Sequence, residues 1–97
     1  MRVVNEDLLA SFRQKKRCER CLRGTPSGAD PHHLFARGAG RADIACNLMA
    51  LCRICHDAFH LGKIKRAELL AIVGRREGMT AEQIESEVQR IRRTPKP

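Results

Sequence analysis

The feature that most constrains this chain is a pair of short cysteine motifs, CERC over residues 18–21 and CRIC over residues 52–55. A C-x-x-C spacing lets the backbone wrap around one side of a metal ion, and two such pairs supply the four thiolates of a tetrahedral zinc site. A redox dithiol is the other reading, but two separated pairs without a βαβ pattern argue against it. We therefore predict a structural zinc site whose ligands are Cys18, Cys21, Cys52 and Cys55.

The composition explains why the chain would need such a site. A chain of 97 residues is one domain, here 1–97, and a domain of this size buries only about 60–65% of the surface that its unfolded chain exposes. The sequence has no Trp or Tyr and only three Phe, so its core is thin, and small domains with thin cores are usually stapled by disulfides or a metal. Five cysteines fit poorly with a disulfide framework, which leaves Cys46 as a small buried residue outside the zinc site.

The charge of the chain indicates a polyanionic partner. It has 19 Lys and Arg against 11 Asp and Glu, which gives a formal net charge of +8. No apolar run approaches the roughly 18–20 residues of a membrane span, and the N-terminal segment carries early acidic residues, unlike a secretory signal. We therefore expect a cytoplasmic protein that binds a polyanion and no membrane.

The apolar and turn patterns predict a small α+β fold with an N-terminal helix, a central hairpin and two supporting C-terminal helices. A C-x-x-C knuckle, then a hairpin, then a second C-x-x-C that enters a helix is the treble-clef arrangement of zinc proteins, which identifies a scaffold but not a function. The core is expected over 18–62 and the C-terminal helices over 63–93. The expected elements are a helix over 5–17 capped by Asn5, a loop over 22–31, extended segments over 32–36 and 44–51, a helix from about Cys55 to Leu61, a helix over 65–76 ending at Gly78, a helix opened by the capping box of Thr80 to Gln83, and a tail over 94–97.

All four histidines lie within residues 32–60, and their spacing suggests a second metal site. His56 and His60 are at positions i and i+4, so a helix places both imidazoles on one face, where they can share an ion. His32 and His33 are adjacent, and adjacent residues of a strand point to opposite faces, so one of the two can join the helical pair as a third ligand. Three imidazoles leave coordination positions open, as a catalytic ion requires.

The segments DPHH over 30–33, NL over 47–48 and LCRICH over 51–56, together with His60, resemble the HNH endonucleases, the ββα-metal nucleases. The signature positions would be His33, Asn47 and His56, and the two histidine pairs look most like the motif of the nuclease colicins. The resemblance covers residues 18–60. It implies a ββα-metal core in a bacterial or phage-encoded protein, with the helices described above flanking that core.

The resemblance also implies a role for each matching residue. His33 would be the general base that takes a proton from water, and Asn47 would hold the loop and orient the imidazole of His33. A neutral imidazole suits this work because its ordinary pKa of about 6.5 lies near neutral pH. His32, His56 and His60 would bind a catalytic divalent ion (Mg²⁺, Mn²⁺, Ni²⁺ or Zn²⁺) that stabilises charge at phosphorus. The implied activity is hydrolysis of DNA phosphodiester bonds to 5′-phosphate and 3′-hydroxyl ends.

Basic residues flank the motif on both sides and are expected to contact phosphates. No segment resembles a base-reading module, and the absence of Tyr and Trp argues against a single-strand stacking platform, so duplex DNA nicked or cut with low sequence specificity is the expected substrate. The chain would act as a monomer or as a homodimer. Two other functions stay open at this point: a non-catalytic treble-clef module that binds DNA, and a zinc-dependent protein-interaction domain. The residues expected to contact DNA are Arg37, Arg41, Arg53, Lys63, Lys65 and Arg66.

Overall fold

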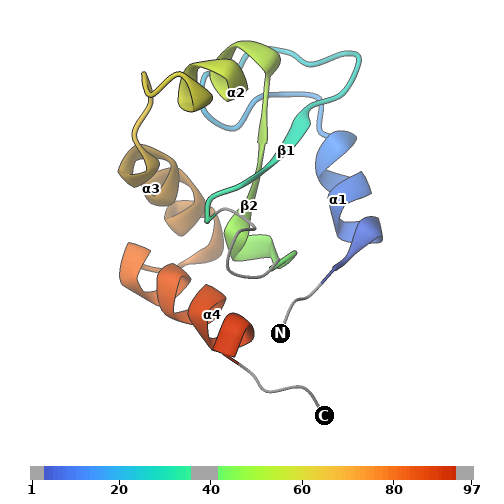
Figure 1. The fold of residues 1–97 in the computed structure, drawn as a ribbon. Helices are drawn as coiled ribbons and strands as arrows, with labels where there is room; N and C mark the ends of the chain where they lie inside the picture. Colours follow the sequence, from blue (N-terminus) through green and yellow to red (C-terminus); the bar gives the residue numbers. More distant parts are fainter. Residues whose placement is uncertain (1–3, 36–41, 94–97) are drawn as a thin grey trace.

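The computed structural model describes residues 4–35 and 42–93 of the chain. Within these ranges the protein is a small α+β fold in which four α-helices surround one two-stranded antiparallel sheet (Figure 1). The elements in chain order are α1 (Glu6–Arg13), β1 (Asp30–His33), the 3-10 helix η2 (Ala45–Asn47), β2 (Leu48–Leu51), α2 (Arg53–His60), α3 (Arg66–Glu77) and α4 (Ala81–Arg93). None of the helices in these ranges is both long and apolar enough to cross a membrane. The expected tail over 94–97, together with Arg37 and Arg41, lies outside the described residues.

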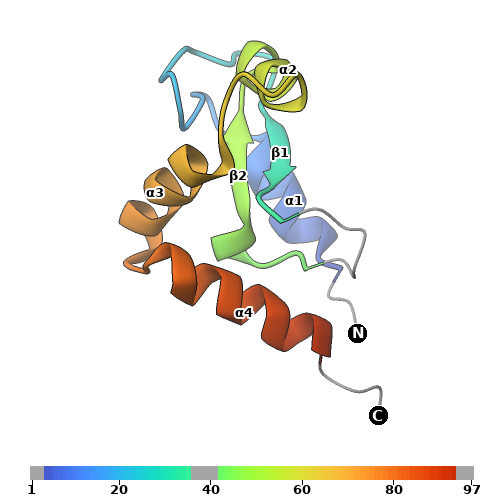
Figure 2. The ribbon, with the colours of Figure 1, turned by 60° about the vertical axis from the view of Figure 1, so that its left-hand side comes forward.

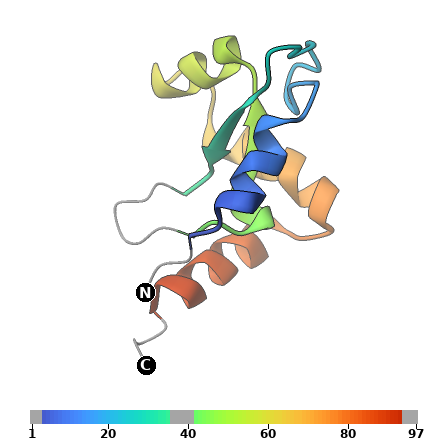
Figure 3. The ribbon, with the colours of Figure 1, turned by 90° about the vertical axis from the view of Figure 1, so that its right-hand side faces the viewer.

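The two strands form the centre of the molecule. They pair antiparallel, with Asp30 opposite Leu51, and all four residues of β2 are buried. Because side chains alternate along a strand, Met49 and Leu51 join the main core with α3 and the start of α4, whereas Leu48 and Ala50 pack with apolar residues of α1. Figure 3 shows α1 on one side of the sheet with α3 behind it, and Figure 2 shows α4 passing below η2. The sheet is thus covered on both faces.

The first helix is shorter than the sequence predicts. It begins as expected after Asn5, whose side chain caps the first turn, but it ends at Arg13 rather than at residue 17. The carbonyl of Arg13, which would accept the N–H of Arg17 in a longer helix, bonds to the following loop instead. It accepts the backbone N–H of Ala29 (3.0 Å), and the carbonyls of Lys16 and Lys15 accept the N–H and the hydroxyl of Thr25. The loop therefore replaces the last helical turn.

The elements around the sheet also differ from the predicted bounds. β1 begins two residues earlier than expected, and β2 begins only after the 3-10 turn that ends at Asn47, inside the segment 44–51 that the sequence predicts as extended. α2 starts at Arg53, earlier than predicted, because the sulfur of Cys52 occupies the N-cap position and accepts the N–H of Cys55 at 3.5 Å. The second cysteine motif therefore forms the N-terminus of this helix.

The C-terminal helices follow the prediction closely. α3 ends at Glu77 and is capped by Gly78, which has a left-handed φ of 68° that favours glycine. The predicted capping box is present, because the backbone N–H of Thr80 donates to the side chain of Gln83 (2.8 Å) and the N–H of Gln83 donates to the hydroxyl of Thr80 (3.1 Å). Local signals specify these boundaries, so the sequence alone suffices to place them.

Candidate functional site

The four cysteines of the two motifs meet at one point beside the start of α2. Their sulfur atoms all lie within 4.8 Å of one another. The sulfurs of Cys21 and Cys52 are 3.7 Å apart, close to the roughly 3.8 Å that separates two thiolates on one tetrahedral zinc ion with Zn–S bonds of about 2.3 Å. Cys46 is buried and lies outside this group, as the sequence predicts. Cys18, Cys21, Cys52 and Cys55 together could hold a zinc ion.

The first cysteine knuckle is attached to the sheet by backbone contacts. The backbone N–H of Glu19 donates to the carbonyl of Ala50 (2.9 Å), and the carboxylate of Glu19 accepts the N–H of Ala50 (2.6 Å). Within the knuckle, the N–H groups of Arg20 and Cys21 point at the sulfur of Cys18, at 3.4 and 3.5 Å. Such N–H···S contacts favour a thiolate, because they stabilise negative charge on sulfur. The knuckle is thus preorganised for a cation.

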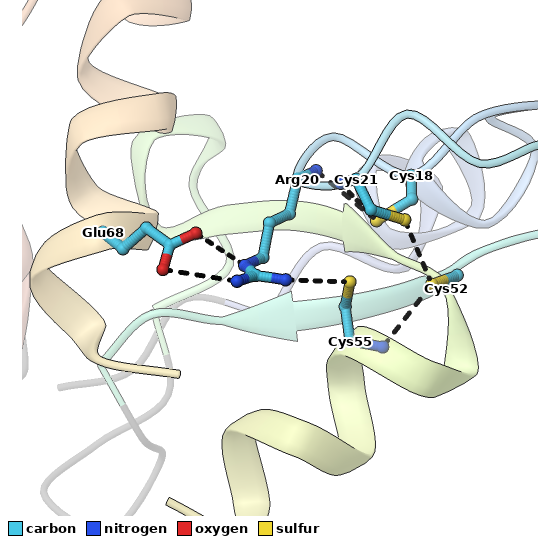
Figure 4. A network of polar contacts seen from close by, with 6 residues as sticks. All are labelled: Cys18, Arg20, Cys21, Cys52, Cys55 and Glu68. Atoms are coloured by element: carbon cyan, nitrogen blue, oxygen red, sulfur yellow. Dashed lines mark hydrogen bonds and ion pairs between the residues drawn. The ribbon is translucent and has the colours of Figure 1, made fainter. Parts of the chain in front are cut away.

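The ionisation of the cysteine cluster depends on its surroundings. Burial opposes ionisation of Cys18, but hydrogen bonds from neighbouring backbone groups outweigh it and lower its pKa to about 7. Burial raises the pKa of Cys55 to about 12, against the opposing hydrogen bond from Arg20. Figure 4 shows the guanidinium of Arg20 between this thiol (3.6 Å) and the carboxylate of Glu68 on α3 (2.6 Å). Four thiolates in this space therefore require a cation, and Arg20 supplies part of the compensating charge.

Three of the four histidines form a second cluster at the other end of α2. His32 from β1 and His56 and His60 from α2 present ring nitrogens within 4.8 Å of one another. The Nε2 atoms of His56 and His60 are 3.1 Å apart, near the roughly 3.3 Å expected for two imidazoles on one ion with bonds of about 2.0–2.1 Å. Strand alternation decides which member of the doublet joins this cluster. His32 shares a face with Met49 toward the main core and α2, and His33 lies on the other face.

His32 carries the clearest sign that this cluster takes a ligand. It is 5% exposed, and its Nε2 atom is buried without a hydrogen-bond partner among the described residues. Burial lowers the pKa of His32 to about 4, and the neighbouring His56 and His60 lower it further. The ring is therefore neutral at pH 7, has one unsatisfied nitrogen, and packs edge-on against the rings of His56 and His60. A divalent cation held by His32, His56 and His60 would satisfy it.

Asp30 supports this cluster from outside. Its carboxylate accepts a hydrogen bond from Nδ1 of His56 at 3.1 Å. This contact fixes the proton on Nδ1 and leaves Nε2 free to bind an ion, as is common for metal-binding imidazoles. The guanidinium of Arg53 lies 3.5 Å from the same carboxylate, so this basic residue is partly engaged at the site.

Asn47 closes the loop between the two strands rather than contacting His33. Its side-chain oxygen accepts the N–H of Phe35 (2.9 Å), and its amide nitrogen donates to the carbonyl of Ala42 (2.9 Å). The expectation that Asn47 holds the loop agrees with these contacts. The expectation that it orients the ring of His33 needs correction, because that ring bonds to Asp43, whose Oδ1 lies 2.7 Å from Nε2.

Asp43 is the residue at this site that the sequence analysis missed. It is 1% exposed, and its second carboxylate oxygen accepts the backbone N–H of Asn5 at 2.8 Å. A signal exists in the sequence, since Asp43 is the only acidic residue between Asp30 and Asp57. That signal does not say which side chain the acid reaches, because the contact depends on the path of the intervening loop.

The histidines line a cleft of about 620 Å³ between α1, β1, α2 and the start of α3. His33 contributes to the wall together with the cluster ligands, so both kinds of imidazole face one space. Two cations line it as well: Arg66, which stacks 5.1 Å over the ring of Phe35, and Arg13 of α1. Lys63 and Lys65 are exposed on the segment that precedes α3, whereas Arg53 is bonded as described above. The cleft is thus lined by two cations against one acid, Glu6, and by apolar as well as polar side chains.

A scan against protein-family models and searches of curated proteins and of solved structures found no match for this chain. The class that the fold and the clusters define is therefore a small α+β protein with a four-cysteine cluster that could hold zinc and a separate three-histidine cluster.

Proposed function

We propose that this chain is a metal-dependent HNH endonuclease that hydrolyses phosphodiester bonds of duplex DNA. The observation that carries the proposal is the cleft in which His32, His56 and His60 converge beside His33, with one buried ring nitrogen of His32 unsatisfied. A purely structural zinc protein has no need of this cluster, because the cysteines provide a complete ligand set of their own. The order of knuckle, hairpin and α2 fits a ββα-metal core joined to a treble-clef zinc site.

Different residues of the cleft have different roles in hydrolysis. The imidazole of His33 takes a proton from the attacking water, whose oxygen forms a bond to phosphorus while the bond from phosphorus to the 3′-oxygen breaks and that oxygen takes a proton from solvent water. His32, His56 and His60 would hold a divalent cation, which would stabilise charge on the phosphate and on the leaving oxygen. Asn47 keeps the two ends of the loop together, so that β1 and η2 hold their relative position.

The charge of the cleft favours a nucleic-acid backbone as substrate. Arg66 and Arg13 line the cleft from opposite elements, α3 and α1, and the chain as a whole carries a net charge of +8. Such contacts position a phosphate backbone without reading its sequence. We expect a salt-sensitive affinity and weak preference among duplex sequences.

Plasmid nicking tests the activity directly. Protein loaded with one zinc per chain is mixed with supercoiled plasmid, and Mg²⁺, Mn²⁺, Ni²⁺ or Zn²⁺ is added singly. At least one ion should give relaxed plasmid, and His33→Ala and His32→Ala should each slow nicking by at least about 100-fold. Arg75→Ala, which removes an exposed cation of α3 away from the cleft, is the matched control. No nicking with any ion, or undiminished nicking by His33→Ala, would overturn the proposal.

A non-catalytic zinc module that binds DNA is the second candidate. The observation that favours it is the separation of the two clusters, since the cysteine cluster and the positive charge suffice for such a module without histidine chemistry. The same experiment distinguishes the two. Retained binding of duplex DNA without nicking under any ion would assign the binding function.

A further inference from the structure

The geometry points to Asp43 as a positioning residue that holds the imidazole of His33 in its Nε2–H tautomer and leaves Nδ1 as the atom that accepts the proton from water. This inference rests on the proposed function, in which His33 is the general base. It adds to that function a residue ten positions further along the chain and an atom-level assignment for the base.

The contact itself dictates the tautomer. Oδ1 of Asp43 lies 2.7 Å from Nε2 of His33, and the Asp43 side chain has no exposed surface. A carboxylate can only accept hydrogen bonds, so Nε2 must carry the proton and, in the neutral ring, Nδ1 carries the lone pair. Nδ1 makes no hydrogen bond within residues 4–35 and 42–93, and the ring lines the cleft. The free lone pair is thus available to a molecule in the cleft.

The burial of Asp43 needs a reason. A buried carboxylate is costly unless its oxygens are hydrogen-bonded, and here the two oxygens reach different elements. Oδ1 bonds to the last residue of β1, and Oδ2 accepts the N–H of Asn5, the N-cap of α1, at 2.8 Å. The carboxylate is therefore fixed from a second side, which prevents the ring of His33 from rotating or exchanging its proton position without breaking a buried contact.

A comparison with Asp30 supports a functional role for the contact between Asp43 and His33. Asp30 bonds to Nδ1 of His56 and leaves Nε2 toward the histidine cluster, whereas Asp43 bonds to Nε2 of His33 and leaves Nδ1. Two carboxylates thus select opposite tautomers for two histidines of one cleft. The free Nε2 of His56 is placed to bind an ion, and the free Nδ1 of His33 is placed to accept a proton.

The first test needs no variant. Long-range ¹H–¹⁵N NMR of the zinc-loaded protein at pH 8 reports which ring nitrogen of each histidine carries a proton. The expected result is Nε2–H for His33. An Nδ1–H tautomer or a doubly protonated ring would overturn the inference. Because this readout does not depend on cleavage, it decides the inference even if the protein nicks no DNA, in which case only the proposed function fails.

The second test is Asp43→Asn, which keeps the size of the side chain but can offer an N–H to Nε2 and reverse the tautomer. In serine proteases the equivalent change lowers kcat by roughly 10⁴-fold. We expect kcat for nicking to fall by about 10²-fold to 10⁴-fold with little change in KM, and the NMR signal of His33 to shift toward Nδ1–H. Asp7→Asn, an exposed acid in the first turn of α1, is the matched control. An Asp43→Asn protein with wild-type kcat would overturn the inference.

Discussion

The contacts of Asn47 allow a stability prediction that can be worked out from the structure. Its side chain is 0% exposed and links the two ends of the loop between the strands, through the N–H of Phe35 and the carbonyl of Ala42. Replacing Asn47 by Ala removes both contacts and leaves both backbone groups without their partner. The change is therefore expected to destabilise the protein even where no DNA or divalent ion is present.

The expected cost follows from the two backbone groups that lose their partner. A buried polar group without a partner costs about 1–3 kcal/mol. The carbonyl of Ala42 is in a fully buried contact and the N–H of Phe35 in a partly buried one, so we take about 2 kcal/mol for the first and about 1 kcal/mol for the second. The total of about 3 kcal/mol is a large share of the roughly 5–15 kcal/mol that a domain of this size has.

Urea unfolding followed by circular dichroism, at fixed zinc and protein concentrations, measures this cost. Thr25→Ala is the matched control, since it removes one buried hydroxyl that donates to the carbonyl of Lys15 at 2.7 Å, away from the cleft. The control should cost about 1 kcal/mol. If Asn47→Ala costs less than about 1 kcal/mol with an unchanged m-value, the argument that this side chain holds the loop is wrong.

Three further changes should have measurable effects. Arg20→Gln should weaken zinc binding by about 10–100-fold in a chelator competition, because a cation beside the thiolates is lost, and an unchanged affinity would contradict this role. Gly74→Ala should lower the unfolding free energy by about 1–3 kcal/mol, since its Cβ would lie 2.5 Å from the carbonyl of Met79; Gly24→Ala, with open space around the new Cβ, is the control, and equal stabilities would refute the clash. The pKa of His32 near 4 lies below its ordinary 6.5, so between these values the unfolded chain binds a proton that the folded ring does not. The contribution of His32 to the free energy of unfolding is therefore fully present above pH 6.5 and declines as the pH falls toward 4. In urea unfolding without added divalent ions, wild type should therefore lose about 2 kcal/mol more than His32→Asn between pH 7 and pH 5, and parallel pH profiles would contradict this.

Local signals in the sequence determined much of this protein. The C-x-x-C spacing identified the four cysteines that the structure brings within 4.8 Å of one another. The capping box at Thr80 and the glycine at position 78 placed the ends of the C-terminal helices. The i, i+4 spacing of His56 and His60 put both rings on one side of α2. Each of these depends on residues that are close in the chain, so a pattern of a few residues contains the physical cause.

Other features depend on contacts that no local pattern encodes. Alternation along a strand says that His32 and His33 face opposite ways, but only the pairing of β1 with β2 decides that His32 joins α2. The end of the first helix was set by carbonyl contacts with a later loop, against its own helical pattern. The partner of the His33 ring is Asp43, a residue that lies ten positions later in the chain. The sequence by itself thus determined which cysteines and histidines are the candidates for metal and proton chemistry. The tertiary structure decided which face each one occupies and which nitrogen it leaves free, because hydrogen bonds between distant segments select one arrangement among several that the local pattern allows.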